Sequence, residues 1–140
     1  MPASIFDKVK MPPAAALLDG RLIDVDIEHR QITVGFDIKP EFLKPSGHVQ
    51  GGILAAMLEH GIDPIVVALT EAEFVTTTVD LHISYMRPVE PGPVSVIGQI
   101  TNMAKQIAYL EARLLDASGR LCARATASCL LMSSAPRRLS

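Results

Sequence analysis

The stretch QGGILAAMLE at residues 50–59 decides the fold, because it opens the only long helix that the sequence predicts. The apolar run continues to about residue 69, and Pro64 predicts an interruption or a kink. Glycines allow a close approach of the backbone, and the first turn of a helix leaves N–H groups unpaired where the helix dipole favours negative charge. Gly51 and Gly52 therefore outline a site that can stabilise an oxyanion.

A single carboxylate, Glu59, lies in the same apolar run, eight residues after Gly51. At about 1.5 Å of rise per residue, one helix separates the two groups by roughly 12 Å. One chain cannot bring both to the same substrate atom. If they act together, a second copy must lie antiparallel, with Glu59 of one chain facing Gly51 of the other, so the sequence predicts a homodimer.

Strands are predicted on both sides of this helix. Residues 21–28 and 30–39 are rich in β-branched side chains and form a hairpin, which follows a short helix at residues 12–18. Four more strands follow the long helix, at residues 74–87, 94–104, 106–115 and 120–132. The sum is an α+β architecture, an antiparallel sheet of about six strands wrapped around one long central helix.

Alternation assigns faces to two of these strands. In residues 74–87, it places Thr77 on the apolar face with Val79 and Thr78 on the opposite face. In the last strand, small apolar residues share one face that suits close approach of a helix: Leu121, Ala123, Ala125, Ala127 and Cys129. Cys122 and Cys129 are an odd number of positions apart, so they point to opposite faces and cannot pair.

Length and composition limit the possible functions. The 140 residues fit one domain, residues 1–140, with a core at about 14–132 and a frayed tail at 133–140. The net charge of −2 arises from 13 basic and 15 acidic residues spread along the chain, which argues against nucleic acid as a partner. Two unpaired cysteines, no signal peptide and no long uninterrupted apolar segment predict a cytoplasmic protein with no membrane partner.

Three segments carry a resemblance to a known family: GHVQGGILAAMLE at residues 47–59, TVDLHISYMRP at 78–88 and DASGRLCA at 116–123. They resemble the hotdog-fold acyl-CoA thioesterases of the phenylacetate-catabolism (PaaI-like) type, and the resemblance covers about residues 14–132. It implies a hotdog fold, hydrolysis of an acyl-CoA thioester, and a homodimer that assembles further into a dimer of dimers. Coenzyme A is implied only as part of the substrate, with no separate cofactor.

The resemblance also implies roles for individual residues. The Gly51 N–H polarises the thioester carbonyl, beside Gln50, which stands where the family commonly has histidine. Glu59, from the partner subunit, is the nucleophile or the general base towards water, and the hydroxyl of Thr78 holds that water. Lys44 stands where the family often has Asn or Gln. The other implied substrate contacts are Gly52, Asp63, Thr77 and His48, with Arg87, Lys105 and Arg124 for the phosphates of coenzyme A.

Other functions fit the sequence less well. Hotdog hydratases and dehydratases use a catalytic His paired with Asp or Glu in a motif that is absent here, and a non-catalytic acyl-CoA-binding module normally needs an output domain. A metal site built from His48, Glu59, His60 and Asp63 is not favoured, because only Glu59 and Asp63 share a helical face. No Gly-x-Ser-x-Gly motif occurs, so a Ser-His-Asp triad is not supported.

Overall fold

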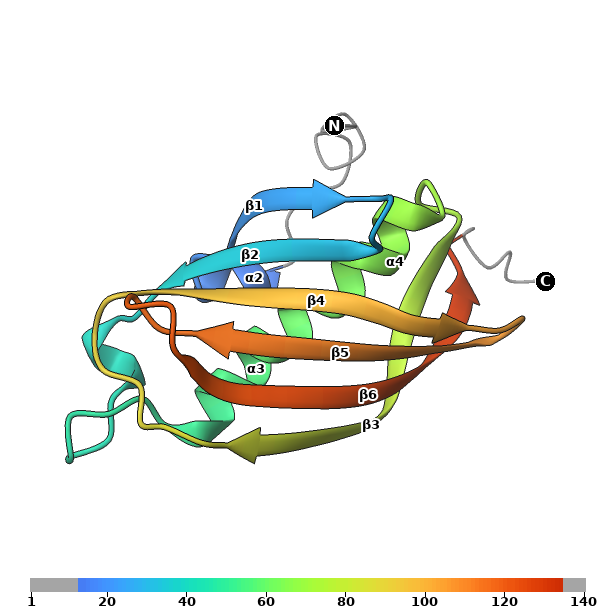
Figure 1. Cartoon of the computed structure of the whole chain (residues 1–140). Coiled ribbons are helices and arrows are strands. Elements are labelled where there is room, and N and C mark those ends of the chain that lie inside the picture. The colour runs from blue at the N-terminus through green and yellow to red at the C-terminus, as the bar shows by residue number, and fades with distance from the viewer. Residues whose placement is uncertain (1–12, 135–140) are drawn as a thin grey trace.

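The computed structural model describes residues 13–134 (Figure 1). The helical elements are α2 (Pro13–Leu17), the 3₁₀ turn η1 (Pro40–Phe42), α3 (Gly51–His60) and α4 (Asp63–Leu69). The strands are β1 (Arg21–Asp26), β2 (Gln31–Asp37), β3 (Phe74–Tyr85), β4 (Pro93–Met103), β5 (Ile107–Leu115) and β6 (Leu121–Ser133). Every predicted helix and strand is therefore present. The predicted first residue of the short helix, Pro12, and the tail beyond residue 134 lie outside the described residues.

The strands form one antiparallel sheet in the order β1-β2-β4-β5-β6-β3. Figure 1 shows α3 and α4 lying across one face of this curved sheet. After the helices, the chain reaches the far edge as β3, which pairs with the last strand, β6. The predicted α+β architecture is confirmed, and β1 and β3 are its two edges.

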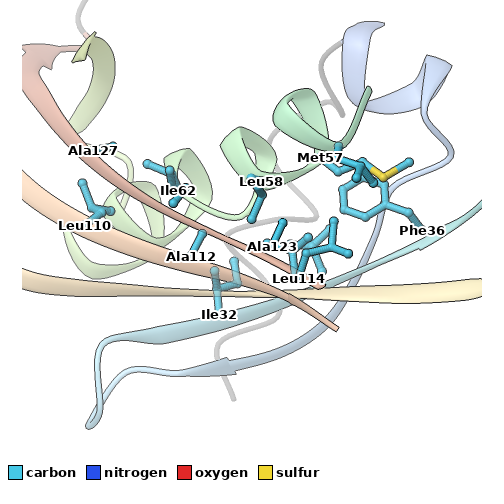
Figure 2. Close-up of a cluster of buried hydrophobic side chains, with 14 of the residues drawn as sticks. Ile32, Phe36, Met57, Leu58, Ile62, Leu110, Ala112, Leu114, Ala123 and Ala127 are labelled. Atoms are coloured by element: carbon cyan, nitrogen blue, oxygen red, sulfur yellow. The ribbon is translucent and has the colours of Figure 1, made fainter. Parts of the chain in front are cut away.

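The core lies between the sheet and the two helices. Met57, Leu58 and Ile62 are fully buried. Figure 2 shows Leu58 of α3 and Ile62, in the turn between α3 and α4, facing β5, the strand that carries Leu110 and Ala112. Burying each large apolar side chain contributes about 1.5–3 kcal/mol. By length and composition alone, Gly51–Leu69 is apolar enough to cross a membrane, a test that buried core helices also pass, and here its apolar side chains pack against the sheet.

The small apolar face of β6 is confirmed. Ala123, Ala125, Ala127 and Cys129 are all buried against the helices and neighbouring strands. Cys122 and Cys129 are both free, as predicted. Small side chains at these positions let the helix approach the sheet closely.

The closest approach joins two glycines. A Cβ atom on Gly98 of β4 would lie 1.7 Å from the Gly61 carbonyl oxygen, and one on Gly61 would lie 2.4 Å from Val96 Cγ1. Gly61 is the C-cap of α3, where the helix ends before Pro64 opens the next one. The predicted interruption near Pro64 therefore lies on β4, with backbone packed directly on backbone.

The predicted faces of Thr77 and Thr78 in β3 are wrong. The register of β3 against β6 shifts between Thr78 and Asp80, so Val79 is an extra, bulged residue and the alternation changes phase. Thr78 lies half-buried on the side of the helices, the same side as Leu81, whereas Thr77 and Val79 are exposed on the other side. A uniform alternation along the whole strand cannot reveal such an insertion.

Candidate active site

The start of α3 is fixed by the loop that precedes it. The Val49 N–H donates to the Val89 carbonyl and the Gln50 N–H to the Phe42 carbonyl, both at 2.9 Å. Gly47 adopts a positive φ of 85°, which a turn in this loop requires. Gln50 then enters the helix from an extended conformation, with φ −65° and ψ 136°.

Gln50 caps the helix with its side chain. Its Oε1 accepts a hydrogen bond from the Ile53 N–H at 3.1 Å, as an N-cap residue does. Its Nε2 amide hydrogens have no partner among residues 13–134, so they are free to donate to a ligand. A Cβ atom on Gly52 would lie 2.9 Å from Gln50 Oε1, so this side chain folds across the glycine.

Gly51 is the first residue of α3. Neither its N–H nor that of Gly52 donates to any group in the described part of the chain. The Tyr85 hydroxyl donates to the Gly51 carbonyl oxygen at 2.8 Å, and a Cβ atom on Gly51 would lie 3.4–3.6 Å from the phenol. Two unpaired N–H groups at a helix start thus lie beside an aromatic ring that reaches them from the end of β3.

Glu59 lies in the last turn of the same ten-residue helix. Its carboxylate is half-buried and makes no ion pair or hydrogen bond with another residue between 13 and 134. Gly51 and Glu59 are separated by eight helical residues, or roughly 12 Å of rise. The separation that the sequence predicted is therefore built into α3.

Asp63 opens α4 one turn beyond Glu59. Its Oδ1 accepts a hydrogen bond from the Thr76 hydroxyl of β3 at 2.5 Å. Burial raises the pKa of the Asp63 carboxyl; the Thr76 hydrogen bond opposes this, the charge of Glu59 adds to it, and His60 opposes it. Asp63 is therefore a half-buried carboxylate with a hydroxyl partner and no cationic ion-pair partner in the described residues.

A thiol and a second hydroxyl complete this polar group. Thr78 Oγ1 lies 3.9 Å from Cys129 Sγ, on the side of the sheet that faces the helices. Burial raises the pKa of the Cys129 thiol; the hydrogen bond to Thr78 opposes this, and the charges of Asp63 and Glu59 raise it further. The predicted residues Glu59, Asp63 and Thr78 are thus brought together, whereas Thr77 points to the other face.

The remaining predicted contacts divide into two groups. Lys44 and His48 lie in the loop before α3, where the Lys44 N–H donates to the His48 carbonyl at 2.8 Å. Lys44 is exposed and His48 is half-buried. Both belong to the segment that leads to Gln50, and their contact with the substrate stays a prediction.

The predicted phosphate-binding cations are spread over the molecule. The Arg87 backbone N–H bonds to the Cys122 carbonyl at the start of β6, whereas Lys105 lies in the turn between β4 and β5, at the opposite end of the sheet. Arg124 is exposed and pairs in register with Arg113 of β5. Within one chain, these three side chains cannot contact the same phosphate group.

Arg87 instead lines a pocket together with Arg120, which was not predicted as a site residue. An open pocket of about 590 Å³ is lined by Met86, Arg87, Arg120 and Leu121. Arg120 Nε donates to Asp116 Oδ2 at 3.0 Å, which leaves the rest of its guanidinium available.

No group of three His, Cys, Asp or Glu side chains within residues 13–134 could hold a metal ion.

Comparisons with known proteins identify the family and the fold of this chain. Residues 46–123, more than half of the chain, match the family model described as the thioesterase superfamily. A Thermoplasma acidophilum protein provisionally named an esterase is 24% identical over 112 residues, covering 76% of this chain and 84% of its own. The solved structures include a phenylacetic acid degradation-related protein from Ralstonia eutropha JMP134, provisionally named a thioesterase.

That structure matches with a TM-score of 0.84 and 28% identity, over 91% of this chain and 96% of its own. The Escherichia coli PaaI protein from the phenylacetic acid degradation operon matches with a TM-score of 0.81 over 94% of this chain and 90% of its own. At 13% identity, that second likeness shows the fold alone.

Proposed function

Because the chain belongs to the thioesterase superfamily, and is on that ground a thioester hydrolase, we propose that it hydrolyses acyl-CoA at a site shared by two copies. The predicted resemblance to PaaI-like thioesterases and the hotdog fold are both confirmed. One observation carries the proposal: two unpaired N–H groups begin the helix whose last turn holds an unpaired carboxylate, Glu59.

In the proposed reaction, the thioester carbonyl oxygen accepts hydrogen bonds from the Gly51 N–H and the Gln50 amide. Glu59 from the second copy removes a proton from water as the water oxygen attacks the carbonyl carbon, or attacks that carbon itself. The C–S bond then breaks, and coenzyme A leaves as a thiolate that takes up a proton. If Glu59 is the nucleophile, this step leaves an acyl anhydride on Glu59, and water hydrolyses it to release the acid and restore the carboxylate. Each preorganised donor of this kind typically lowers the barrier by about 3 kcal/mol. Thr78, on the helix-facing side, offers a hydroxyl to the water.

Strand β3 supports the antiparallel arrangement of the two copies. Near its start, Thr76 bonds to Asp63; at its end, Tyr85 bonds to Gly51. It is also an edge strand, with a pairing partner on one side only in the sheet order. If two copies pair antiparallel through β3 about a twofold axis, the Glu59 end of each lies beside the Gly51 end of the other.

The pocket beside Tyr85 supports coenzyme A as the carrier. It begins at the residue after Tyr85, and its volume lies within the range of small-molecule sites. The Arg87 guanidinium forms no ion pair with any residue between 13 and 134, and Arg120 keeps donors free. Arginine suits phosphate because its planar donors match phosphate oxygens. We propose this pocket for the nucleotide phosphates.

The shared site is tested by complementation between two inactive variants. Glu59→Gln removes the carboxylate and should lower kcat about a thousandfold. Gly51→Pro removes the N–H alone, because proline suits the first position of a helix and the extended Gln50 suits the residue before it. Refolded together, the two variants should recover about a quarter of wild-type activity, since about half of the dimers are mixed and each holds one intact site.

Each variant refolded alone is the control, and circular dichroism verifies that both still fold. Full activity in Glu59→Gln would contradict the proposed role of the carboxylate. No recovery in a mixture shown to contain mixed dimers would contradict the shared site. Hydration of an enoyl-CoA without any thioester hydrolysis would contradict the reaction itself.

The carrier is tested with paired substrates, an acyl-CoA and the same acyl group on pantetheine, which lacks the nucleotide. Arg87→Ala should raise KM about tenfold for the acyl-CoA and leave the acyl-pantetheine unchanged. Arg113→Ala, an exposed arginine elsewhere on the sheet, is the matched control. Equal KM changes for both substrates would argue against phosphate binding in this pocket.

A further inference from the structure

The start of α3 is held from two sides. On one side, the Gln50 side chain folds over Gly52 and bonds to the Ile53 N–H. On the other side, the Tyr85 ring lies against Gly51 while its hydroxyl bonds to the Gly51 carbonyl oxygen. Each glycine therefore has one side chain packed across it, and Tyr85 lies 34 positions after Gly51 in the sequence.

Two successive glycines make a flexible helix start, because glycine restricts the backbone least. An oxyanion site needs the opposite property, since donors stabilise developing charge best when they are already oriented. The Gly51 carbonyl and the Gly52 N–H belong to the same planar peptide group. A hydroxyl that fixes this carbonyl therefore also fixes the direction of the Gly52 N–H, the second unpaired donor beside the Gly51 N–H.

Helix stability alone does not require this contact. An α-helix already provides a donor for its first carbonyl, the N–H four residues further along. Tyr85 is also 52% exposed, so its ring contributes little to the core. A half-exposed phenol that adds a second donor to a satisfied carbonyl, next to two unpaired N–H groups, is better explained by the site than by the fold.

We propose that Tyr85 is a positioning residue of the oxyanion site: its hydroxyl fixes the Gly51–Gly52 peptide, and its ring forms the wall along which the thioester lies. This inference rests on the proposed function, because the thioester is the ligand that the wall faces. It adds a residue of β3 to a site otherwise built from α3 and its preceding loop. Tyr85 also directly precedes Met86 and Arg87, which line the pocket proposed for the phosphates.

The test uses the fact that the chain has two tyrosines, Tyr85 and Tyr109, and no tryptophan. Tyr85→Phe removes the hydroxyl and keeps the ring, so kcat should fall about tenfold with KM unchanged. Tyr109→Phe, on an exposed tyrosine of β5, is the matched control and should leave both constants unchanged. Thermal unfolding of both variants should match the wild type, which separates positioning from a loss of stability.

A spectroscopic measurement tests the wall without any turnover. In the Tyr109→Phe protein, Tyr85 is the only tyrosine, and its emission should change saturably as a non-hydrolysable acyl-pantetheine thioether is added. In the Tyr85→Phe protein, emission from Tyr109 should stay constant over the same titration. The thioether lacks adenine, so it does not absorb the exciting light.

The outcomes separate the two proposals. If the wild type hydrolyses thioesters and Tyr85→Phe has wild-type kcat, Tyr85 is not a positioning residue. If the wild type binds the thioether with no change in Tyr85 emission, the ring is not a wall of the site. If the wild type hydrolyses no thioester at all, the proposed function itself fails, whatever the two variants do.

Discussion

At the scale of single residues, Asp63 has the most unusual surroundings. It is half-buried, accepts a bond from Thr76, and forms no ion pair with any described residue. Burial raises its pKa above the ordinary value of 3.8, so the folded chain keeps a proton that the unfolded chain releases. The preference of the folded chain for the protonated carboxyl stabilises it fully below pH 3.8, and this stabilisation is lost as pH rises through the raised pKa.

Asp63→Asn should therefore stabilise the protein at neutral pH. Asparagine keeps an acceptor for the Thr76 hydroxyl and cannot ionise, so it avoids the cost of a buried charge. Urea unfolding at fixed protein concentration should show a higher midpoint than the wild type at pH 7 to 8. That advantage should shrink as the pH falls towards 3.8.

Asp116→Asn is the control of opposite sign. Hydrogen bonds from the Arg120 backbone N–H lower the pKa of the Asp116 carboxyl, with further bonds from Ser118 and the Arg120 side chain. Its contribution to stability is present above the ordinary value of 3.8 and is lost as pH falls through the lowered pKa, so this variant should be destabilised at neutral pH. Destabilisation of Asp63→Asn at pH 7 would contradict the account of Asp63.

The candidate site residues that sequence reasoning could propose are those that lie close together in the chain. Gln50 caps α3, and Gly51 and Glu59 lie within it, so regular helical geometry links their spacing directly to their positions. Tyr85 and Arg120 were missed as site residues because their contacts join segments far apart in sequence, and no local pattern carries that information. The bond between Thr76 and Asp63 was missed for the same reason.

At the scale of secondary structure, the contact of Gly61 with Gly98 sets where the helices lie. Because the Gly61 carbonyl would lie 1.7 Å from a Cβ atom on Gly98, a larger residue on β4 must lift the helix break away from the sheet. No side-chain rotation relieves a clash with backbone. This contact fixes the distance of α3 from the sheet, and hence the distance of Gly51 and Glu59 from the strands.

Gly98→Ala should therefore lower the free energy of unfolding by at least about 1–3 kcal/mol, the usual cost of overpacking. Gly35→Ala is the matched control in β2, because its added Cβ would meet Ile23 Cδ1, the end of an exposed and movable side chain. Urea unfolding of the two variants gives the comparison. Equal stability of Gly98→Ala and Gly35→Ala would show that the helix can move without cost.

The element boundaries were predictable, but the faces of β3 were not. Proline, glycine and alternation mark where helices and strands begin and end, and every expected element was found. A bulge needs only one extra residue, and nothing in the sequence around Val79 marks it. The inward direction of Thr78 therefore depends on pairing with β6, which a single strand's pattern does not contain.

At the scale of the whole molecule, the two edge strands of the sheet, β1 and β3, each contain one β-bulge. Each edge strand holds one bulged aliphatic residue, Ile23 in β1 and Val79 in β3, which are 54% and 60% exposed. Only β3 reaches both ends of the candidate site, through its bonds to Asp63 and Gly51. The homodimer remains a prediction, and this matched pair of residues can test which edge forms it.

Val79→Lys places a charge at the edge proposed for pairing, so it should shift the protein towards monomer and remove thioesterase activity together. Ile23→Lys makes the same change at the other edge and should preserve both assembly and activity. Sedimentation of the two variants alongside hydrolysis assays gives the answer. A monomeric Val79→Lys protein with full activity would rule out a site shared through β3.

The length of α3 has a final consequence for how activity depends on protein abundance. Its ten residues keep Gly51 and Glu59 of any one chain in two different sites, so on the proposed mechanism a solitary molecule is inert. Specific activity should then fall gradually as the protein is diluted through the dissociation constant of the dimer. A cell could silence the enzyme by halting synthesis and letting growth thin it out, with no inhibitor required.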